Sequence, residues 1–385
     1  MSVTWSALES LPNELLDGII ASLSAPPPSL YKLHQPPCAR ISKCETHDLK
    51  NLSRASSRLR EVLLPRLFSH ACFDLQDTDA FLLFVCTLDL GRYVTSIVVK
   101  GRHSPGSRED PFWWRQVLSR LDPLRVTVIA PPSFLGAMMG TQIMDGHSWA
   151  FQVSLQILQL ERDNRGCDAT SSLDYETCSS LMEAGPWSTL LFNESSSLKA
   201  YNHYEYFLFQ VPSLFSKWGS AACSKSRQEQ KILCHSLNTL TSFRYTAVFP
   251  FYNHVKLVLN VVELMENLQA LSVQLAPGEN DKATELEQRG SMDPSDPWME
   301  IATGYSLIAH SVKEMGFRGG LVEFHVGDYS FDALRPELSI ILEDVLGNTD
   351  WIHDGRGTWT RNIGHTPIPA TSMDVTSSPL PTYTV

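Results

Sequence analysis

Seven short apolar runs with the residue types of β-strands recur after residue 90, and they constrain the fold more than any other feature of the chain. The runs occupy residues 94–99, 124–129, 155–160, 198–201, 240–245, 268–275 and 321–326. Stretches with helical spacing of apolar residues precede several of them, at residues 79–88, 111–121, 255–265 and 305–315. The pattern predicts a helix-then-strand unit that is used repeatedly.

Several runs have the form L-x-x-L-x-L with branched or aromatic replacements, as in Leu268, Leu271 and Val273. A unit of this kind buries its apolar face only against its neighbours, so the strands are expected to form one parallel sheet with the helices on its convex side. The spacing of the runs is uneven. A mixed α/β domain without repeat symmetry is therefore the alternative.

Composition limits the class of protein. The chain has 385 residues, which favours several domains or one elongated repeat domain. Its formal net charge is −11, spread along the sequence, which argues against nucleic acid or an anionic membrane as a partner. The first residues do not read as a signal peptide and no stretch reads as a membrane span, so we expect an intracellular protein, cytoplasmic or nuclear. The eight cysteines include no C-x-x-C pair and are expected to be reduced.

The N-terminal stretch predicts a short helix with one wide apolar face. Its apolar residues fall at Leu11, Leu15, Leu16, Ile19, Ile20 and Leu23, and Pro12 suits a first helical turn. A second helix is predicted over residues 48–68, with Asp48 as its N-cap and a disruption at Pro65. Its apolar stripe contains Leu49, Leu52, Leu59 and Leu63.

Together these segments resemble an F-box, the helical module that docks onto the Skp adaptor of cullin-RING ubiquitin ligases. The resemblance lies in Leu11-Pro12-Asn13-Glu14-Leu15-Leu16, in the Asp48-Leu49 pair, and in the basic, aliphatic end at Arg66-Leu67-Phe68. It implies that the adaptor covers Leu11, Pro12, Leu15, Leu16, Ile19, Ile20, Leu23, Leu49, Leu52, Leu59 and Leu63. The later part resembles the degenerate leucine-rich horseshoes that follow F-boxes in many fungal proteins. An ordinary helical hairpin packed on the rest of the chain is the alternative for the first part.

The two helices are separated by a longer gap than the F-box pattern has. Residues 24–47 form an insertion rich in proline, which we expect to be a loosely packed surface loop. His34, Cys38, Cys44 and His47 lie in it, but they lack the closely spaced cysteine pair of a zinc knuckle. We therefore predict no metal site.

The sequence contains none of the motifs of nucleophilic hydrolases, P-loop or dinucleotide-binding enzymes, or zinc proteases, so we expect neither catalysis nor a cofactor. Aromatic residues offer a candidate site for a protein substrate, because they follow two predicted strands and aromatic side chains are frequent anchors at interfaces. Core packing is the alternative role for them. The candidates are Tyr201, Tyr204, Tyr206, Phe249, Phe251 and Tyr252.

The sequence thus predicts an α/β protein: an F-box-like helical domain at residues 1–68, a leucine-rich-repeat-like solenoid with one parallel sheet at residues 69–360, and a disordered tail at residues 361–385. The expected function is that of a substrate-recognition subunit of an SCF-type ubiquitin ligase, with a Skp adaptor and, through it, a cullin as partners. A repeat-type protein-interaction module without ligase assembly is the alternative. The protein substrate is not identified by the sequence.

Overall fold

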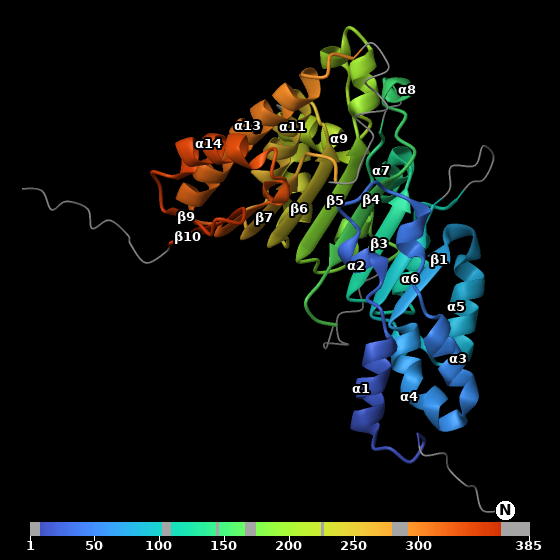
Figure 1. Ribbon diagram of the computed structural model, residues 1–385. Coiled ribbons are helices and arrows are strands. Elements are labelled where there is room, and N and C mark those ends of the chain that lie inside the picture. The colour runs from blue at the N-terminus through green and yellow to red at the C-terminus, as the bar shows by residue number, and fades with distance from the viewer. Residues whose placement is uncertain are drawn as a thin grey trace, which may run out of the picture.

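One mixed β-sheet runs through the body of the protein, with its strands in nearly the same order as in the sequence (Figure 1). The structure is a computed structural model, and it describes residues 8–101, 109–143, 146–165, 175–224, 227–278 and 292–362. Within these residues the sheet has ten strands, ordered β1-β2-β3-β4-β5-β6-β7-β8-β10-β9. Their bounds are β1 (His70–Asp74), β2 (Ser96–Lys100), β3 (Arg125–Ala130), β4 (Gln156–Glu161), β5 (Thr189–Ser196), β6 (Ser242–Val248), β7 (Ala270–Gln274), β8 (Glu323–Val326), β9 (Trp351–His353) and β10 (Thr358–Arg361).

The strands do not all run in the same direction. β1, β2 and β3 pair in parallel, and so do β5, β6, β7 and β8. However, β4 is antiparallel to both β3 and β5, and β10 is antiparallel to both β8 and β9. The predicted fold class, an F-box domain followed by a leucine-rich-repeat-like solenoid with one parallel sheet, is therefore wrong. The protein has a mixed, open α/β sheet.

The connections around β4 explain its reversal. Ala130 at the end of β3 pairs with Gln156 at the start of β4, so residues 131–155 remain at one end of the sheet. This connection contains α7 (Pro132–Met138) and α8 (Ser148–Phe151). The chain therefore enters β4 at the end of the sheet where it leaves β3, which makes the two strands antiparallel.

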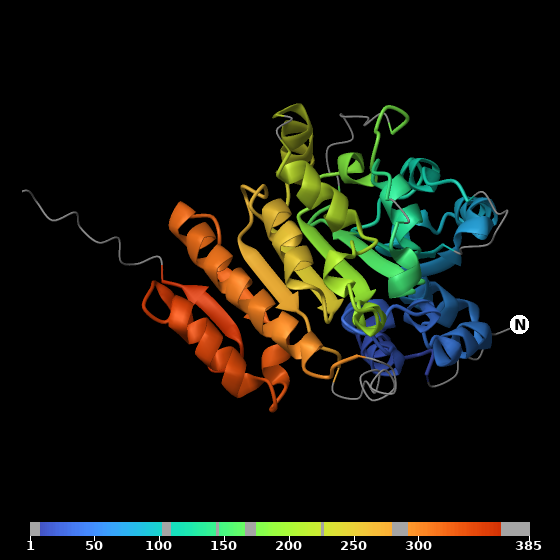
Figure 2. The ribbon, with the colours of Figure 1, turned by 90° about the horizontal axis from the view of Figure 1, so that it is seen from above.

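Helices cover one face of the sheet, where α9, α11, α13 and α14 lie side by side (Figure 2). Side chains from this layer, such as Trp114, Phe215 and Tyr305, join Val99 and Val128 of the strands in one continuous core. The layer contains α5 (Thr78–Thr87), α6 (Trp113–Leu118), α9 (Leu214–Ala222), α11 (Tyr252–Val262), α13 (Asp296–Arg318) and α14 (Arg335–Leu346). The other helical segments of the body are α10 (Arg227–Leu237), η2 (Leu75–Asp77), η3 (Gly91–Tyr93), η4 (Leu181–Ala184), η5 (Leu198–Asn202), η6 (Tyr206–Leu208) and η7 (Gly327–Ser330).

The insertion at residues 24–47, called the strap below, packs across the opposite face of the sheet instead of forming a loose loop. It contains α2 (Pro28–Tyr31), in front of the sheet in Figure 1, and η1 (Ala39–Ser42). Leu33 and Ile41 of the strap are buried in a second apolar cluster with strand residues Val98, Ile129, Ile157 and Leu191. The Nδ2 of Asn193 in β5 donates hydrogen bonds to the carbonyl oxygens of Leu33 and Gln35, at 2.7 and 2.9 Å.

Three helices flank the strap in sequence and form their own small core below the sheet: α1 (Asn13–Leu23), α3 (His47–Ala55) and α4 (Ser57–Phe68) (Figure 1). The predicted helix over residues 48–68 is divided at Ser56, whose hydroxyl accepts a hydrogen bond from the Leu59 amide and caps α4. Pro65 does not end α4, which continues to Phe68. Helices α1, α3 and α4 thus share one small core, whereas the strap between α1 and α3 packs on the sheet.

Most of the predicted strands overlap observed ones, with one exception. Residues 198–201 form the 3₁₀-helix η5, and the strand in this part of the chain is β5, which was not predicted. The strands β1, β9 and β10 were also missed. Most of the predicted tail, residues 363–385, lies outside the described residues.

Candidate binding surfaces

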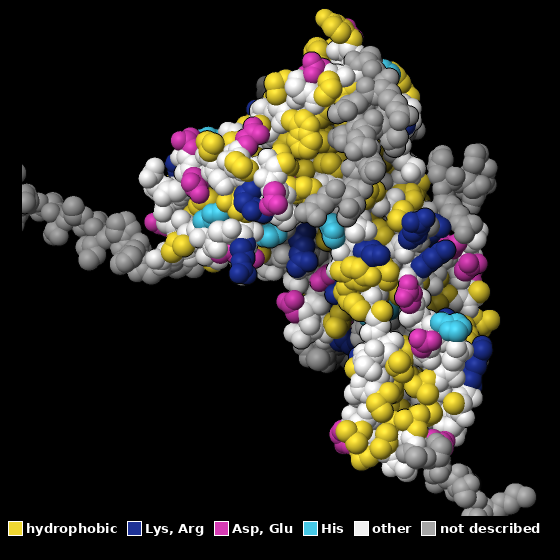
Figure 3. All heavy atoms as spheres, viewed as in Figure 1, with side chains coloured by type: hydrophobic (Ala, Val, Ile, Leu, Met, Phe, Trp, Pro, Cys, Tyr) yellow, Lys and Arg dark blue, Asp and Glu magenta, His cyan; other side chains and the backbone are white. Residues whose placement is uncertain are grey.

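Helix α1 divides its apolar residues between two faces. Leu16 and Ile20 are each 1% exposed and belong to the core of the three N-terminal helices. Leu15, Ile19 and Leu23 lie on another side of the helix and are 56%, 37% and 41% exposed. Residues four apart lie on one helical face, so these three side chains form a continuous apolar stripe. Figure 3 shows hydrophobic side chains gathered over this lower part of the molecule.

The other residues that the F-box resemblance assigned to the adaptor mostly face inward. Leu49, Leu59 and Leu63 are buried in the same small core, against which Leu11 and Leu52 pack. Pro12 is the exposed N-cap residue of α1. The structure thus makes the α1 stripe the most exposed apolar part of the predicted adaptor site, while the buried residues hold the helices together.

An arginine of α4 holds the start of α1 in place. Arg58 of α4 donates through Nη2 to the carbonyl oxygen of Leu11 at 2.9 Å and through Nη1 to that of Glu9. The same guanidinium lies 3.3 Å from Oδ1 of Asn13, the first residue of α1. These contacts satisfy backbone acceptors just before the helix and orient α1 on α4.

The predicted substrate residues are divided between core and surface. Tyr201, Phe249 and Phe251 are at most 3% exposed. The Tyr201 hydroxyl donates to the carbonyl oxygen of Phe249 at 3.2 Å, and its ring packs edge-on against Phe251. Tyr206 is partly buried against the same core. Because these rings are turned inward, they position the surrounding loops, and Tyr204 and Tyr252 are the two predicted residues that reach the surface.

Phe207, which follows the predicted Tyr206, and two tryptophans missed by the sequence analysis extend that exposed area. We call the whole the aromatic surface, and its members are between 39% and 94% exposed: Trp149, Tyr204, Phe207, Tyr252 and Trp298. Trp149 lies in α8 and Trp298 near the start of α13, so neither is close in sequence to the predicted cluster. Their exposure was not evident from sequence, since Trp is usually buried.

Ring contacts and hydrogen bonds join the segments of the aromatic surface. Trp149 packs on His203 and Phe209, with ring centroids 4.8 and 5.6 Å apart. The carbonyl oxygen of Phe207 accepts a hydrogen bond from Asn253 at the start of α11. Next to it the Tyr252 amide donates to Oε2 of Glu300 in α13 at 2.5 Å. The surface is therefore supported by α8, η6, α11 and α13 together.

Beyond the strap, the second face of the sheet is polar and partly open. Side chains that alternate with core residues of β6, β7, β8 and β10 form a row in register: Arg244, Ser272, His325 and Thr358. A cavity of about 900 Å³ opens between this row and the strap, lined by His34, Gln35, Pro36, Gln274, Gly278, His325, Val326, Gly327, Ser330, Phe331 and Arg356. Lys, Arg and His side chains gather in this region in Figure 3. Among the described residues of this lining, His, Gln, Ser and Arg side chains can donate hydrogen bonds and none has a carboxylate, which suits a polar or acidic segment of a partner.

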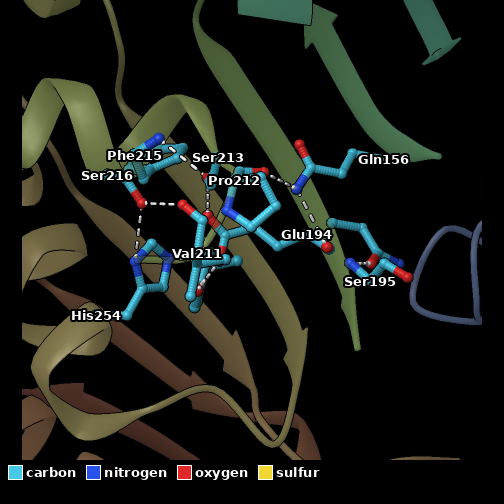
Figure 4. Close-up of polar contacts among 11 residues, drawn as sticks. Gln156, Glu194, Ser195, Val211, Pro212, Ser213, Phe215, Ser216 and His254 are labelled. Atoms are coloured by element: carbon cyan, nitrogen blue, oxygen red, sulfur yellow. Dashed lines mark hydrogen bonds and ion pairs between the residues drawn. The ribbon is translucent and has the colours of Figure 1, made fainter. Parts of the chain in front are cut away.

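A buried polar network lies between β5 and the helices (Figure 4). The Glu194 carboxylate accepts hydrogen bonds from Tyr245 at 2.5 Å and from Ser213, and it lies 2.7 Å from Nε2 of His254. Ser216 Oγ lies 3.3 Å from Nδ1 of His254. Burial, followed by the charge of Glu194, raises the pKa of Tyr245 well above its usual range.

The order Ser216, His254, Glu194 matches that of a hydrolytic triad, but the hydrogen bonds oppose that role. The Ser216 hydroxyl donates its one proton to the carbonyl oxygen of Val211 at 2.5 Å, so it accepts from Nδ1–H of His254. Nε2 of His254 faces the Glu194 carboxylate. Ser216 is 2% exposed, so its hydroxyl is not accessible to a substrate. The network is a buried set of hydrogen bonds that fixes β5 to α9 and α11.

Comparisons with known proteins found no match: no family model, no curated protein and no solved structure matches the chain. The function is therefore inferred from the surfaces described above. In the part of the chain that the structure describes, no group of three or more His, Cys, Asp or Glu side chains is placed to hold a metal ion. None of the described helices is both long and apolar enough to cross a membrane.

Proposed function

We propose that this protein is the substrate-recognition subunit of an SCF-type cullin-RING ubiquitin ligase. The α1 stripe, Leu15, Ile19 and Leu23, binds a Skp adaptor and through it the cullin. The observation that carries the proposal is the exposure of these three aliphatic side chains on a helix whose adjacent face already has a core. An apolar helical face of this kind is stabilised when a partner covers it. The Leu11-Pro12-Asn13-Glu14-Leu15-Leu16 motif supports the adaptor as that partner.

The aromatic surface is the proposed site for the protein substrate. It lies around α8 and the starts of α11 and α13, and α1 lies at the other end of the molecule (Figure 1). A substrate bound there leaves the α1 stripe free for the adaptor. Large aromatic side chains supply contact area at low conformational cost, which makes them effective anchors for a protein partner.

In this role the chain performs no chemistry of its own. It holds the substrate near the ubiquitin-charged enzyme of the ligase, so that transfer becomes effectively intramolecular. The polar cavity beside the strap offers a second set of contacts, with His34, His325 and Arg356 as donors to an acidic segment of the substrate. Neither surface needs a cofactor.

Co-purification with a Skp adaptor tests the proposal. The double variant Leu15→Asp/Ile19→Asp places two charges in the interface. If each loses about 1.5 kcal/mol or more of apolar burial, affinity falls at least ~100-fold. Ile340→Asp on α14 is the matched control, because Ile340 is also an exposed aliphatic residue of a helix. Adaptor binding by the wild-type chain and the control, but not by the double variant, supports the proposal. Equal binding by all three, or by none, contradicts it.

A protein-interaction module without ligase assembly is the second candidate. The strap favours it, because Leu33 and Ile41 make part of the N-terminal region integral to the sheet. Deleting residues 1–68 does not separate the two candidates, since the deletion also uncovers Val98, Ile129 and Ile157. The point substitutions on α1 do separate them, because they leave the strap in place.

A further inference from the structure

Two cysteines from distant parts of the sequence face each other beside the N-terminal helices. Cys44 belongs to the strap just before α3, and Cys72 lies in β1, the edge strand of the sheet. Their Sγ atoms are 4.0 Å apart and share a hydrogen bond. A disulfide bond is about 2.05 Å long, so the two sulfur atoms must approach each other by about 2 Å to form one.

The cysteine pair is open to small molecules. Both side chains line a cavity of about 910 Å³ between the strap, α4, β1 and α5. Cys72 is exposed and Cys44 is partly exposed. Lys43, Lys50 and Arg60 also line the cavity and give it a positive charge.

The surroundings give the two thiols different roles. The hydrogen bond with Cys72 has the largest effect on Cys44, and together with the charge of Lys50 it outweighs burial and lowers the pKa of Cys44 to about 7. The hydrogen bond with Cys44, followed by burial, raises the pKa of Cys72. Because the thiolate is the nucleophile in cysteine oxidation, Cys44 is the attacking residue and Cys72 the one that resolves the product.

We propose that Cys44 and Cys72 form a reversible disulfide bond when hydrogen peroxide enters this cavity. The Cys44 thiolate attacks one peroxide oxygen, the O–O bond breaks, and a sulfenic acid forms as hydroxide leaves and takes up a proton to become water. Cys72 then attacks the Cys44 sulfur, the S–O bond breaks, and the departing hydroxide takes the thiol proton as a second water. The two thiols together lose two electrons, and the peroxide gains them.

The disulfide bond between Cys44 and Cys72 links the segment just before α3 to β1 at the edge of the sheet. Cys44 and Cys72 are 28 residues apart in sequence, and all of α3 and α4 lies between them. Closing this loop restricts how the N-terminal helices move on the body of the protein, because a cross-link limits the conformations of the segment that it encloses. Thiol reductants reverse the step by exchange. The inference does not depend on adaptor binding.

Mass spectrometry of the peroxide-treated full chain tests the proposal. We expect a loss of about 2 Da and, in a non-reducing digest, a peptide pair joined through Cys44 and Cys72, both reversed by dithiothreitol. Cys86→Ser is the matched control, because Cys86 is an exposed cysteine on α5, and it should keep the cross-link. In Cys72→Ser, Cys44 should stop at the sulfenic acid, which dimedone traps.

Two results would overturn it: oxidation of Cys86 or Cys223 at peroxide concentrations that leave Cys44 and Cys72 unlinked, or a 2 Da loss that persists in Cys44→Ser. If a variant does not fold, the wild-type chain still decides the question. Alkylating its accessible thiols with iodoacetamide before peroxide treatment should abolish the cross-linked peptide pair. If the peptide pair forms in wild-type chain that received peroxide without prior alkylation, the proposal is supported. If the pair does not form there, the proposal is contradicted.

Discussion

Glu194 and His254 contact each other inside the protein, with the carboxylate Oε2 and the imidazole Nε2 2.7 Å apart and side chains 2% and 3% exposed. Glu194 belongs to β5 and His254 to α11, so the pair joins the sheet to its helical layer. Polar groups removed from water are stable only when their hydrogen-bond partners remain in place. The packing of α11 on the sheet therefore depends on both residues.

Removing either member of this pair should destabilise the protein strongly. Glu194→Gln and His254→Gln each leave a buried polar group without its hydrogen-bond partner, and we expect each to lower the free energy of unfolding by about 1–3 kcal/mol. Glu314→Gln is the control, because it breaks an exposed pair with Arg318 and should cost about 1 kcal/mol or less. Urea denaturation measures all three. Losses below about 1 kcal/mol at Glu194 and His254 would show that the pair is not maintained.

The stability of the protein should also depend on the protonation of Asp328. This side chain is fully buried, and its Oδ2 accepts hydrogen bonds from Tyr305 and from the amides of Leu275 and Ala276. Burial is the largest influence and raises the pKa of Asp328 to about 6, although the hydrogen bonds oppose it. An unfolded aspartate has a pKa of about 3.9. The contribution of Asp328 is therefore fully present below about pH 4 and is lost as pH rises through about 6.

Asp328→Asn removes this titration. Between pH 4 and pH 7 the wild-type chain should lose about 3 kcal/mol of unfolding free energy relative to the variant, since the shift is about two pKa units. Other groups titrate in both proteins, so the difference between the two curves is the measurement. Denaturation at several pH values gives it, and parallel curves would contradict the assignment to Asp328.

The β-strands show how much of the fold the sequence could reveal. The runs that became β2 and β3 were recognisable from their branched apolar residues, but residues 155–160 read equally well in either direction, so the reversal of β4 was not visible. β5 was missed because Asn193 and Glu194 interrupt its apolar run. Both are buried polar residues, at 1% and 3% exposure, and each has partners far along the chain. Such partners are set by the tertiary structure, which local patterns do not contain.

Local sequence patterns also did not show which candidate binding residues are exposed. The spacing of Leu15, Leu16, Ile19 and Ile20 predicted one wide apolar face, which the structure divides into an inner and an outer half. Which half faces inward depends on where α4 packs, and the sequence does not specify that. The strap is similar, because its proline-rich composition indicated a loop, whereas Leu33 and Ile41 anchor it on the sheet.

The two halves of α1 should respond differently to substitution. Leu16→Ala removes a side chain from the small N-terminal core and should lower the stability of that core by about 2–5 kcal/mol. Leu15→Ala leaves the core intact and should change stability by about 0.5 kcal/mol or less. Hydrogen exchange of the α1, α3 and α4 amides measures both. Equal loss of protection in the two variants would mean that Leu15 also faces inward.

Asn193 should control the attachment of the strap. Asn193→Ala removes both donors to the carbonyl oxygens of Leu33 and Gln35, and leaving such acceptors unpaired costs about 1–3 kcal/mol. We expect limited proteolysis to cut within residues 24–47 faster in this variant. Asn267→Ala is a control, because Asn267 also donates two hydrogen bonds but contacts Asn238. An unchanged rate of cleavage in Asn193→Ala would show that Leu33 and Ile41 hold the strap without it.

Two helical glycines should respond in opposite directions to the same change. Gly219 lies where α9 meets α11, and a Cβ added there would stand 2.4 Å from the carbonyl oxygen of Leu257. Gly219→Ala should therefore push the two helices apart and destabilise the protein by about 1–3 kcal/mol. Gly18 lies in α1 with no atom within 4 Å of such a Cβ, so Gly18→Ala should stabilise that helix by up to about 1 kcal/mol. Thermal denaturation compares them, and a Gly219→Ala variant as stable as the wild type would contradict the close approach of α9 and α11.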